Sequence, residues 1–149
     1  MQDFWGGIFS NQVLWITILS WAIAQGIKII IGIAGGKKFS FYWVLRTGGM
    51  PSAHSAAVVS LALSLGKEEG FSSPVFALAA IIALITMFDA QTWRRSIGVQ
   101  ARVLNNILDD FHKKRRVGEE RLKELVGHTP VEVIVGGSIG FIVFLLFYR

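Results

Sequence analysis

The chain has 149 residues, of which 52% are hydrophobic and 17% charged, and its mean hydropathy of +0.52 favours a membrane protein over a soluble one. The length fits one membrane-embedded domain over residues 1–149, and the lack of cysteine excludes a disulfide framework and a thiolate metal site. The net charge is +5, and nine of the fifteen Lys and Arg lie between Arg94 and Lys123, tethered between apolar segments, which favours an anionic substrate or lipid headgroups over nucleic acid.

Four apolar segments alternate with polar loops and predict an all-α membrane bundle. The segment Met1–Ser10 precedes them, lacks the basic residues of a signal peptide and has the aromatic content of a membrane interface. The first apolar segment is long enough to cross a bilayer, whereas the second and third are short, which leaves buried helices as the alternative to four crossings. The apolar segments are Val13–Ala34, Ser52–Gly66, Pro74–Phe88 and Thr129–Tyr148.

The polar region Gly98–Gly127 is expected to form a helical insert between the third and fourth apolar segments. Val99, Val103, Ile107 and Phe111 recur at every fourth residue, which is typical of one face of an amphipathic helix. Two further short helices are expected in the loops, at Ser40–Leu45 and Glu119–Val126.

The charges of the loops predict the orientation in the membrane. The first and third loops are basic, whereas the second holds Lys67 beside Glu68 and Glu69. By the positive-inside rule, the first and third loops face the cytoplasm, and both termini lie outside a multi-pass protein of the cell membrane. Six residues suited to phosphate chemistry then share the cytoplasmic face: Arg46, His54, Asp89, Arg94, Arg95 and His128.

The stretch that begins at Arg46 is the first candidate for a site. Two glycines lead into Pro51 and then into small residues, which is typical of a loop entering a helix with proline in its first turn. The first-turn N–H groups, including those of Ser52 and Ala53, would be free to cradle an anion at the positive end of the helix dipole. His54 would overhang that anion. The alternative is an ordinary helix start with an incidental histidine.

A second candidate precedes the last apolar segment. Thr129 as N-cap, Pro130 at the first helical position and Glu132 two residues later match a capping box, which gives Glu132 a structural alternative to a catalytic role. His128 lies just outside this cap, again at a helix N-terminus. We therefore expect His128 to take part in function.

Further charged residues fit either a site or a structural role. Asp89 ends an apolar run and would be costly against lipid, so it should face a cavity or form an ion pair with Arg94, Arg95 or Lys28. Lys28 either extends to the membrane interface or reaches the site. Arg95 and Arg102 are seven residues apart, a spacing that suits a phosphate clamp or a membrane-facing surface. No histidines or carboxylates show the ligand spacing of a metal site, so no metal and no cofactor is expected.

The stretch Met50–Ser55 resembles the Pro-Ser-Gly-His motif of the type 2 phosphatidic acid phosphatases, with Ala53 in place of the glycine. Over residues 12–149 the chain resembles more closely a small divergent membrane branch of that superfamily, which also includes bacterial acid phosphatases and vanadium haloperoxidases. The resemblance implies an all-α integral membrane bundle with a core like that of these phosphatases, about four transmembrane helices and a cytoplasmic amphipathic insert. The matching pieces are Gly48–Ser55, Met87–Ala90 with Arg94 and Arg95, and Gly127–Glu132.

The resemblance also implies a phosphohistidine mechanism. His128 would be the nucleophile, Glu132 or Asp89 its acidic partner and His54 the general acid. A neutral imidazole is nucleophilic near pH 7, and clamped oxyanions stabilise the developing charge. Phosphate would be held by Lys38, Arg46, Gly49, Ser52, Ala53, Arg94 and Arg95, with Lys28 and Arg102 as further candidates.

Two classes of function are compatible with these residues. One is an integral-membrane phosphatase that hydrolyses a phospholipid or polyprenyl phosphate or pyrophosphate. The other is a non-catalytic relative that binds anionic lipid or helps to move it, because the chain lacks the family's Ser-Arg pair before His128 and has Glu132 where the family has aspartate. A homodimer is expected, since a small bundle needs a second copy to cover the site.

Overall fold

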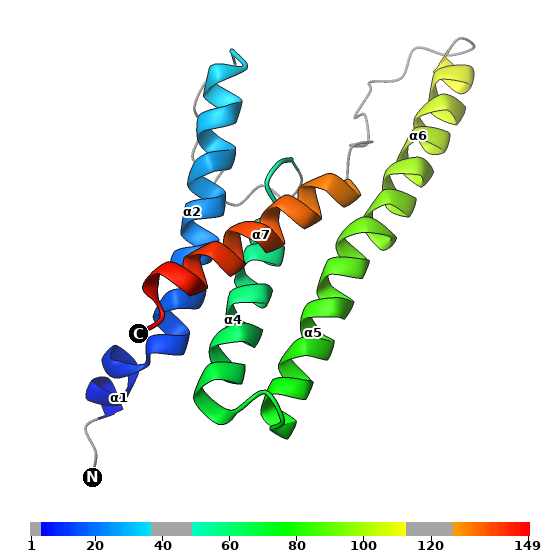
Figure 1. Ribbon diagram of the computed structural model, residues 1–149. Coiled ribbons are helices and arrows are strands. Elements are labelled where there is room, and N and C mark those ends of the chain that lie inside the picture. Colours follow the sequence, from blue (N-terminus) through cyan, green and yellow to red (C-terminus); the bar gives the residue numbers. More distant parts are fainter. Residues whose placement is uncertain (1–3, 37–48, 113–126) are drawn as a thin grey trace.

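The computed structural model describes residues 4–36, 49–112 and 127–149, and these residues form an all-helical membrane bundle with no strand among them. The predicted short helices at 40–45 and 119–126 lie outside the described residues. The helices, in chain order, are α1 (Phe4–Ser10), α2 (Gln12–Ala34), α4 (Ala53–Glu69), α5 (Pro74–Gln91), α6 (Trp93–His112) and α7 (Pro130–Phe147) (Figure 1).

Side chains that cap the helix N-termini fix where four helices begin. In each case the oxygen of the N-cap side chain accepts a hydrogen bond from the backbone N–H three residues later, which satisfies a donor that has no partner within the helix. Pro74 and Pro130 occupy the first helical position, where a missing N–H costs nothing. The caps are Asn11 for α2, Ser52 for α4, Ser73 for α5 and Thr129 for α7.

Two expected helix boundaries were wrong. Pro51 is not in the first turn of α4, because Ser52 is the N-cap and the helix begins at Ala53. At the other end α4 continues past Gly66, where the apolar segment was expected to end, to Glu69, since lysine and glutamate are good helix formers, and it ends at Gly70 with a φ of 90°. The amphipathic helix α6 begins at Trp93, directly after α5, and continues through Gly98, which the sequence had left open.

Helix α4 lies at the centre of the bundle and packs against α2, α5 and α7. Its contact with α7 is unusually close, because a Cβ atom built on Gly136 would lie 2.2 Å from the carbonyl oxygen of Ser52, and one built on Gly140 would lie 2.2 Å from that of Ala56. Glycine, alanine and serine at membrane helix contacts allow this close approach of backbones. The small residues of α4 therefore fix where α7 crosses it.

Three of the described helices, α2, α5 and α7, are long and apolar enough by length and composition to cross a membrane. Helix α4 has 17 residues and ends in Lys67, Glu68 and Glu69. Three neighbouring helices enclose α4, as expected if it is a short buried helix and does not span the membrane. A crossing by α4 therefore stays a prediction. Helix α5, by contrast, is long and apolar enough to span the membrane.

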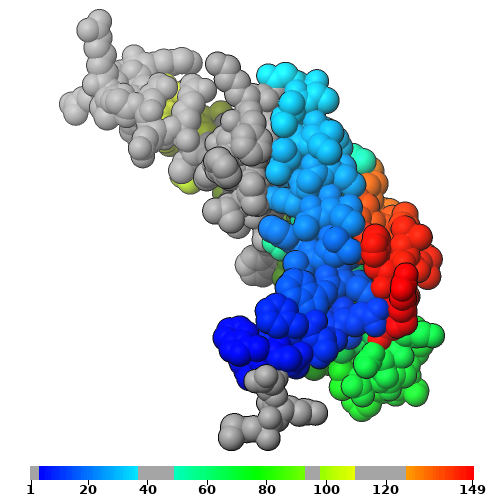
Figure 2. All heavy atoms as spheres, turned by 90° about the vertical axis from the view of Figure 1, so that its left-hand side faces the viewer, coloured from blue at the N-terminus to red at the C-terminus, as the bar shows by residue number. Residues whose placement is uncertain are grey.

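The two ends of the bundle differ in what they contain. At one end α1, the C-terminus and the turn between α4 and α5 gather, with α2 running along the face above them (Figures 1 and 2). There the Gln12 side chain donates to the carbonyl of Phe147 at 3.3 Å, and the Tyr148 hydroxyl donates to Glu68. The opposite end holds the N-termini of α4 and α7. Which end faces the cytoplasm stays a prediction.

Candidate active site

At the end of the bundle that holds the N-termini of α4 and α7, two backbone hydrogen bonds connect these two termini and the last turn of α5. The N–H of Ser52 donates to the carbonyl of Glu132 at 3.0 Å and ties the start of α4 to the first turn of α7. The N–H of His128 donates to the carbonyl of Ala90 at 3.0 Å and ties the residue before α7 to the last turn of α5. The positive ends of the α4 and α7 dipoles therefore meet beside the last turn of α5, which favours an anion there.

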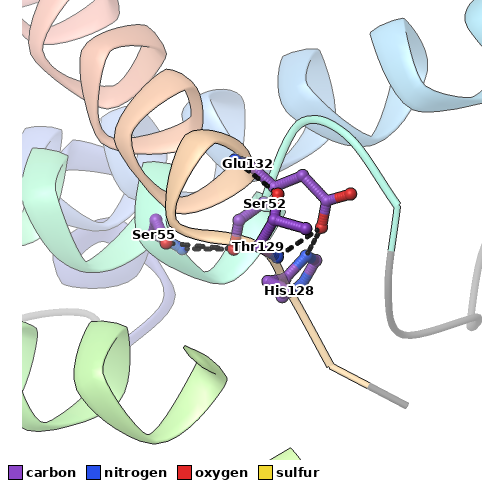
Figure 3. A network of polar contacts seen from close by, with 5 residues as sticks. All are labelled: Ser52, Ser55, His128, Thr129 and Glu132. Atoms are coloured by element: carbon purple, nitrogen blue, oxygen red, sulfur yellow. Dashed lines mark hydrogen bonds and ion pairs between the residues drawn. The ribbon is translucent and has the colours of Figure 1, made fainter. Parts of the chain in front are cut away.

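His128 and Glu132 form a contact through their side chains, with 3.0 Å between Nδ1 and Oε2 (Figure 3). The imidazole is completely buried, and the carboxylate is 19% exposed. An ionised carboxylate can only accept hydrogen bonds, so Nδ1 carries the proton and the lone pair of a neutral imidazole lies on Nε2. In this arrangement an acidic side chain orients the histidine through Nδ1, and Nε2 is the nitrogen that can act as a nucleophile or base.

The same carboxylate oxygen closes the capping box. Oε2 of Glu132 accepts from the N–H of Thr129 at 3.1 Å, and the Thr129 hydroxyl accepts from the N–H of Glu132 at 3.3 Å. The capping role and the histidine contact are thus not alternatives, because one oxygen serves both. Capping holds Glu132 in a fixed rotamer, and this rotamer is the one that reaches His128.

Ser52 is fully buried and uses its side chain as the N-cap of α4. Its Oγ accepts from the N–H of Ser55 at 3.3 Å and from the Ser55 hydroxyl at 3.0 Å (Figure 3). The expectation that the Ser52 amide is free to bind an anion was wrong, because this N–H is donated to Glu132. The reason is tertiary: α7 brings a backbone carbonyl to the place where the anion was expected.

Lys28, in the last third of α2, is half-buried, and its charge interacts with that of Glu132. This electrostatic interaction acts between α2 and the carboxylate of the histidine–carboxylate pair. Both alternatives for Lys28, the membrane interface and the candidate site, stay predictions. A cation placed there is suited to a phosphoryl oxygen as well as to the carboxylate.

The other predicted site residues at this end are distributed on both sides of the α4 start. Ala53 is buried in the first turn of α4, and His54, the next residue, is exposed. Gly49 has a φ of 85°, which glycine adopts without steric cost, and it turns the chain toward the cap. Asp89 is exposed in the last turn of α5, one residue before the carbonyl that binds His128, and two of its expected ion-pair partners, Arg94 and Arg95, have side chains outside the described residues.

The remaining predicted residues are not placed at the site. Lys38 and Arg46 lie outside the described residues, as do the side chains of Arg94 and Arg95 in the first turn of α6. Arg102 is exposed on α6. Among the residues that the structure describes, no three His, Asp or Glu side chains form a group suited to a metal ion.

Sequence reasoning missed the residues that bring the site together. Nothing in the sequence marks the carbonyl of Ala90 or the hydroxyl of Ser55 as part of a site, because every residue has a backbone carbonyl and serine is a common small residue. Gly136 and Gly140 did carry a signal, since small residues four apart in an apolar helix indicate a close helix contact. The sequence does not say which helix they contact.

Comparison with known proteins agrees with these motifs. The model of the Divergent PAP2 family matches residues 9–143. The chain is 38% identical over 150 residues to the uncharacterized membrane protein YuiD of Bacillus subtilis (strain 168), an alignment that covers 93% of this chain and 95% of that protein. No solved structure matches the chain significantly. The chain therefore belongs to the Divergent PAP2 family of membrane proteins.

Proposed function

We propose that this protein is an integral-membrane phosphatase that hydrolyses a phospholipid or polyprenyl phosphate or pyrophosphate through a phosphohistidine at His128. The observation that carries the proposal is the 3.0 Å contact between His128 Nδ1 and Glu132 Oε2, at the point where the N-termini of α4 and α7 meet. An oriented imidazole beside two positive helix ends is suited to attack on a phosphorus atom.

The proposed reaction has two steps. The lone pair of His128 Nε2 attacks phosphorus, the bond from phosphorus to the leaving oxygen breaks, and His54 in its protonated form donates a proton to that oxygen. A water molecule then attacks the phosphohistidine while neutral His54 takes its proton, and the nitrogen–phosphorus bond breaks to release phosphate. Glu132 accepts the Nδ1–H bond throughout, which stabilises the imidazole as positive charge develops.

Substrate binding is divided between two kinds of surface. The apolar helices α2, α5 and α7 place the acyl or prenyl chain in the membrane, next to the end of the bundle that holds the pair. Lys28 and the amide of Ala53 would bind phosphoryl oxygens, together with the basic residues of the loops that precede α4 and α7. By the positive-inside rule this end faces the cytoplasm.

A second function, binding or moving anionic lipid without turnover, is favoured by one specific observation. The His128 imidazole is completely buried, and the Glu132 oxygen that contacts it also caps α7. A histidine enclosed in this way stabilises the loop without reacting. For the phosphatase, by contrast, Nε2 must be opened to the substrate, so the two functions predict different effects of substitution.

Phosphate release by detergent-purified protein separates the two functions. The substrates are phosphatidic acid, phosphatidylglycerol phosphate, and undecaprenyl phosphate and diphosphate. We expect turnover that is abolished in His128→Ala and His54→Ala, and that falls about 10²–10⁴-fold in Glu132→Gln, which keeps a capping oxygen but loses the charge. Glu68→Gln, at the opposite end, is the matched control. Folded protein that binds these lipids but releases no phosphate would establish the non-catalytic function.

A further inference from the structure

Helix α6 exposes the apolar side predicted by its four-residue periodicity. Val99, Val103, Leu104 and Ile107 are 46–53% exposed, and among the described helices the contacts of α6 are chiefly with α5, at the junction that joins the two end to end. Gln100 is also exposed and lies between them on the helical wheel, at 100° per residue. These five residues are called the α6 face. The buried positions on the other side of the helix are Gly98, Ala101 and Asn105.

The position of α6 argues against lipid as the cover of this face. Eighteen residues of α5 span about 27 Å, which matches a hydrocarbon thickness of roughly 30 Å. At the junction Thr92 has α-helical torsion angles and its N–H donates to Phe88, so α6 continues the line of α5 past the level at which α4 and α7 begin (Figure 1). An amphipathic helix that binds the membrane surface lies in its plane instead. An apolar stripe carried out of the membrane in this way is typical of a protein contact.

We propose that the α6 face binds the α6 face of a second copy of this chain, in a parallel pair about a twofold axis normal to the membrane. Ile85 and Phe88 are exposed on the side of α5 that the helical period brings into line with Val99 and Val103. A partner that covers the exposed side chains of both α5 and α6 needs an apolar helix that crosses the membrane and extends out of it on the side where α6 lies. A second copy of α5–α6 meets this requirement with its own identical surface.

The area of the α6 face is too small for a stable interface by itself, so a pairing must also include part of α5. An aliphatic side chain buries roughly 60–120 Å², so four half-exposed ones supply on the order of 120–240 Å² in each copy. A stable interface takes about 800 Å² from each partner. The α6 face alone is too small, and the exposed side chains of Ile85 and Phe88 extend it along α5 within the membrane.

Gln100 gives the pair its register. It lies at the centre of the α6 face, so in a parallel pair the two copies of Gln100 meet at the twofold axis, where each amide can donate to the other. A single polar residue in an apolar seam selects one register and one orientation at some cost in stability. An antiparallel or shifted pair would bury Gln100 against aliphatic side chains.

Cysteine cross-linking in native membranes tests this geometry, because the chain contains no cysteine of its own. We expect Gln100→Cys and Ile107→Cys to form a disulfide-linked dimer on mild oxidation. Arg102→Cys, on the exposed polar side of the same helix, is the matched control and should remain a single chain. Equal cross-linking at all three positions, or none at Gln100 and Ile107, would overturn the proposal.

The mass of the protein in lipid nanodiscs gives an independent measurement. The wild type should contain two copies, and Ile107→Lys should contain one. Arg102→Glu changes the charge at an exposed position on the polar side of the same helix and should retain two copies. An unchanged thermal unfolding temperature in both variants would show that the bundle is intact. A wild-type protein with a single copy would mean that another segment or another protein covers the α6 face, and the proposed pair would be wrong.

Discussion

A methyl group at position 136 would collide with the backbone of α4, whereas a methyl group at position 137 would not. The Cβ atom of Gly136→Ala lies 2.2 Å from the Ser52 carbonyl oxygen, and that of Gly140→Ala lies 2.2 Å from the Ala56 carbonyl oxygen. The Cβ atom of Gly137→Ala comes no closer than 3.5 Å to a side-chain atom of Val59, which is ordinary contact. The three variants add the same methyl group to the same helix, so they differ only in what it meets.

The expected changes in stability have opposite signs. Replacing glycine by alanine within a helix stabilises it by roughly 0.5–1 kcal/mol, and Gly137→Ala should keep this gain. Relieving the clash at position 136 or 140 requires backbones to separate by about 1 Å, and overpacking of this kind costs about 1–3 kcal/mol. The carbonyl is not a flexible side-chain end, so the cost should lie in the upper part of this range. Gly136→Ala and Gly140→Ala are therefore expected to be net destabilised by about 1–2 kcal/mol.

Tryptophan fluorescence during thermal unfolding in detergent measures these differences, since the chain has five tryptophans. Each kcal/mol corresponds to roughly 2–4 °C in the unfolding temperature of a chain of this size. Gly137→Ala should unfold at or above the temperature of the wild type, and the other two variants clearly below it. Equal unfolding temperatures for Gly136→Ala and Gly137→Ala would refute the close contact between α4 and α7.

Three further changes test the ends of the bundle by the same thermal measurement. Thr129→Val removes the hydroxyl that caps α7, so stability should fall by about 1 kcal/mol, while phosphate release is largely kept because the backbone N–H of residue 129 still holds Glu132 Oε2. Abolished turnover would give the hydroxyl a catalytic role. Ser52→Ala leaves the buried Ser55 hydroxyl and N–H without their acceptor and should cost about 1–3 kcal/mol; a neutral effect would contradict the buried network. Burial and the hydrogen bond to Glu68 raise the pKa of Tyr148 to about 12, so the folded state keeps a proton that the unfolded chain releases near pH 10. The stability that this provides is present below pH 10 and is lost as the pH rises toward 12, and in Tyr148→Phe the unfolding temperature should fall less over that range.

The starts of the helices could be predicted from sequence where a signal lies within a few residues. Thr129, Pro130 and Glu132 specify the start of α7, because the donors and acceptors of a cap are local. The contact between His128 and Glu132 is of the same kind, since residues four apart at a helix start are within reach of each other. The periodicity of α6 likewise showed which of its sides is apolar, although it could not show where the helix begins.

Only the tertiary structure decided which of these local features meet. Nothing near Ser52 in the chain indicates that its amide is donated to Glu132, and nothing near His128 indicates that Ala90 accepts its N–H. These contacts depend on how closely α7 can approach α4, and that distance is set by Gly136 and Gly140, which show their small size in the sequence but not their partner. The sequence by itself determined the apolar segments that form α2, α5 and α7 and the cap of α7, and it left Glu132 and Asp89 open as the partner of His128. Packing decided that the helix ends meet, that His128 is enclosed and that His54 is exposed, because burial depends on residues that are distant along the chain.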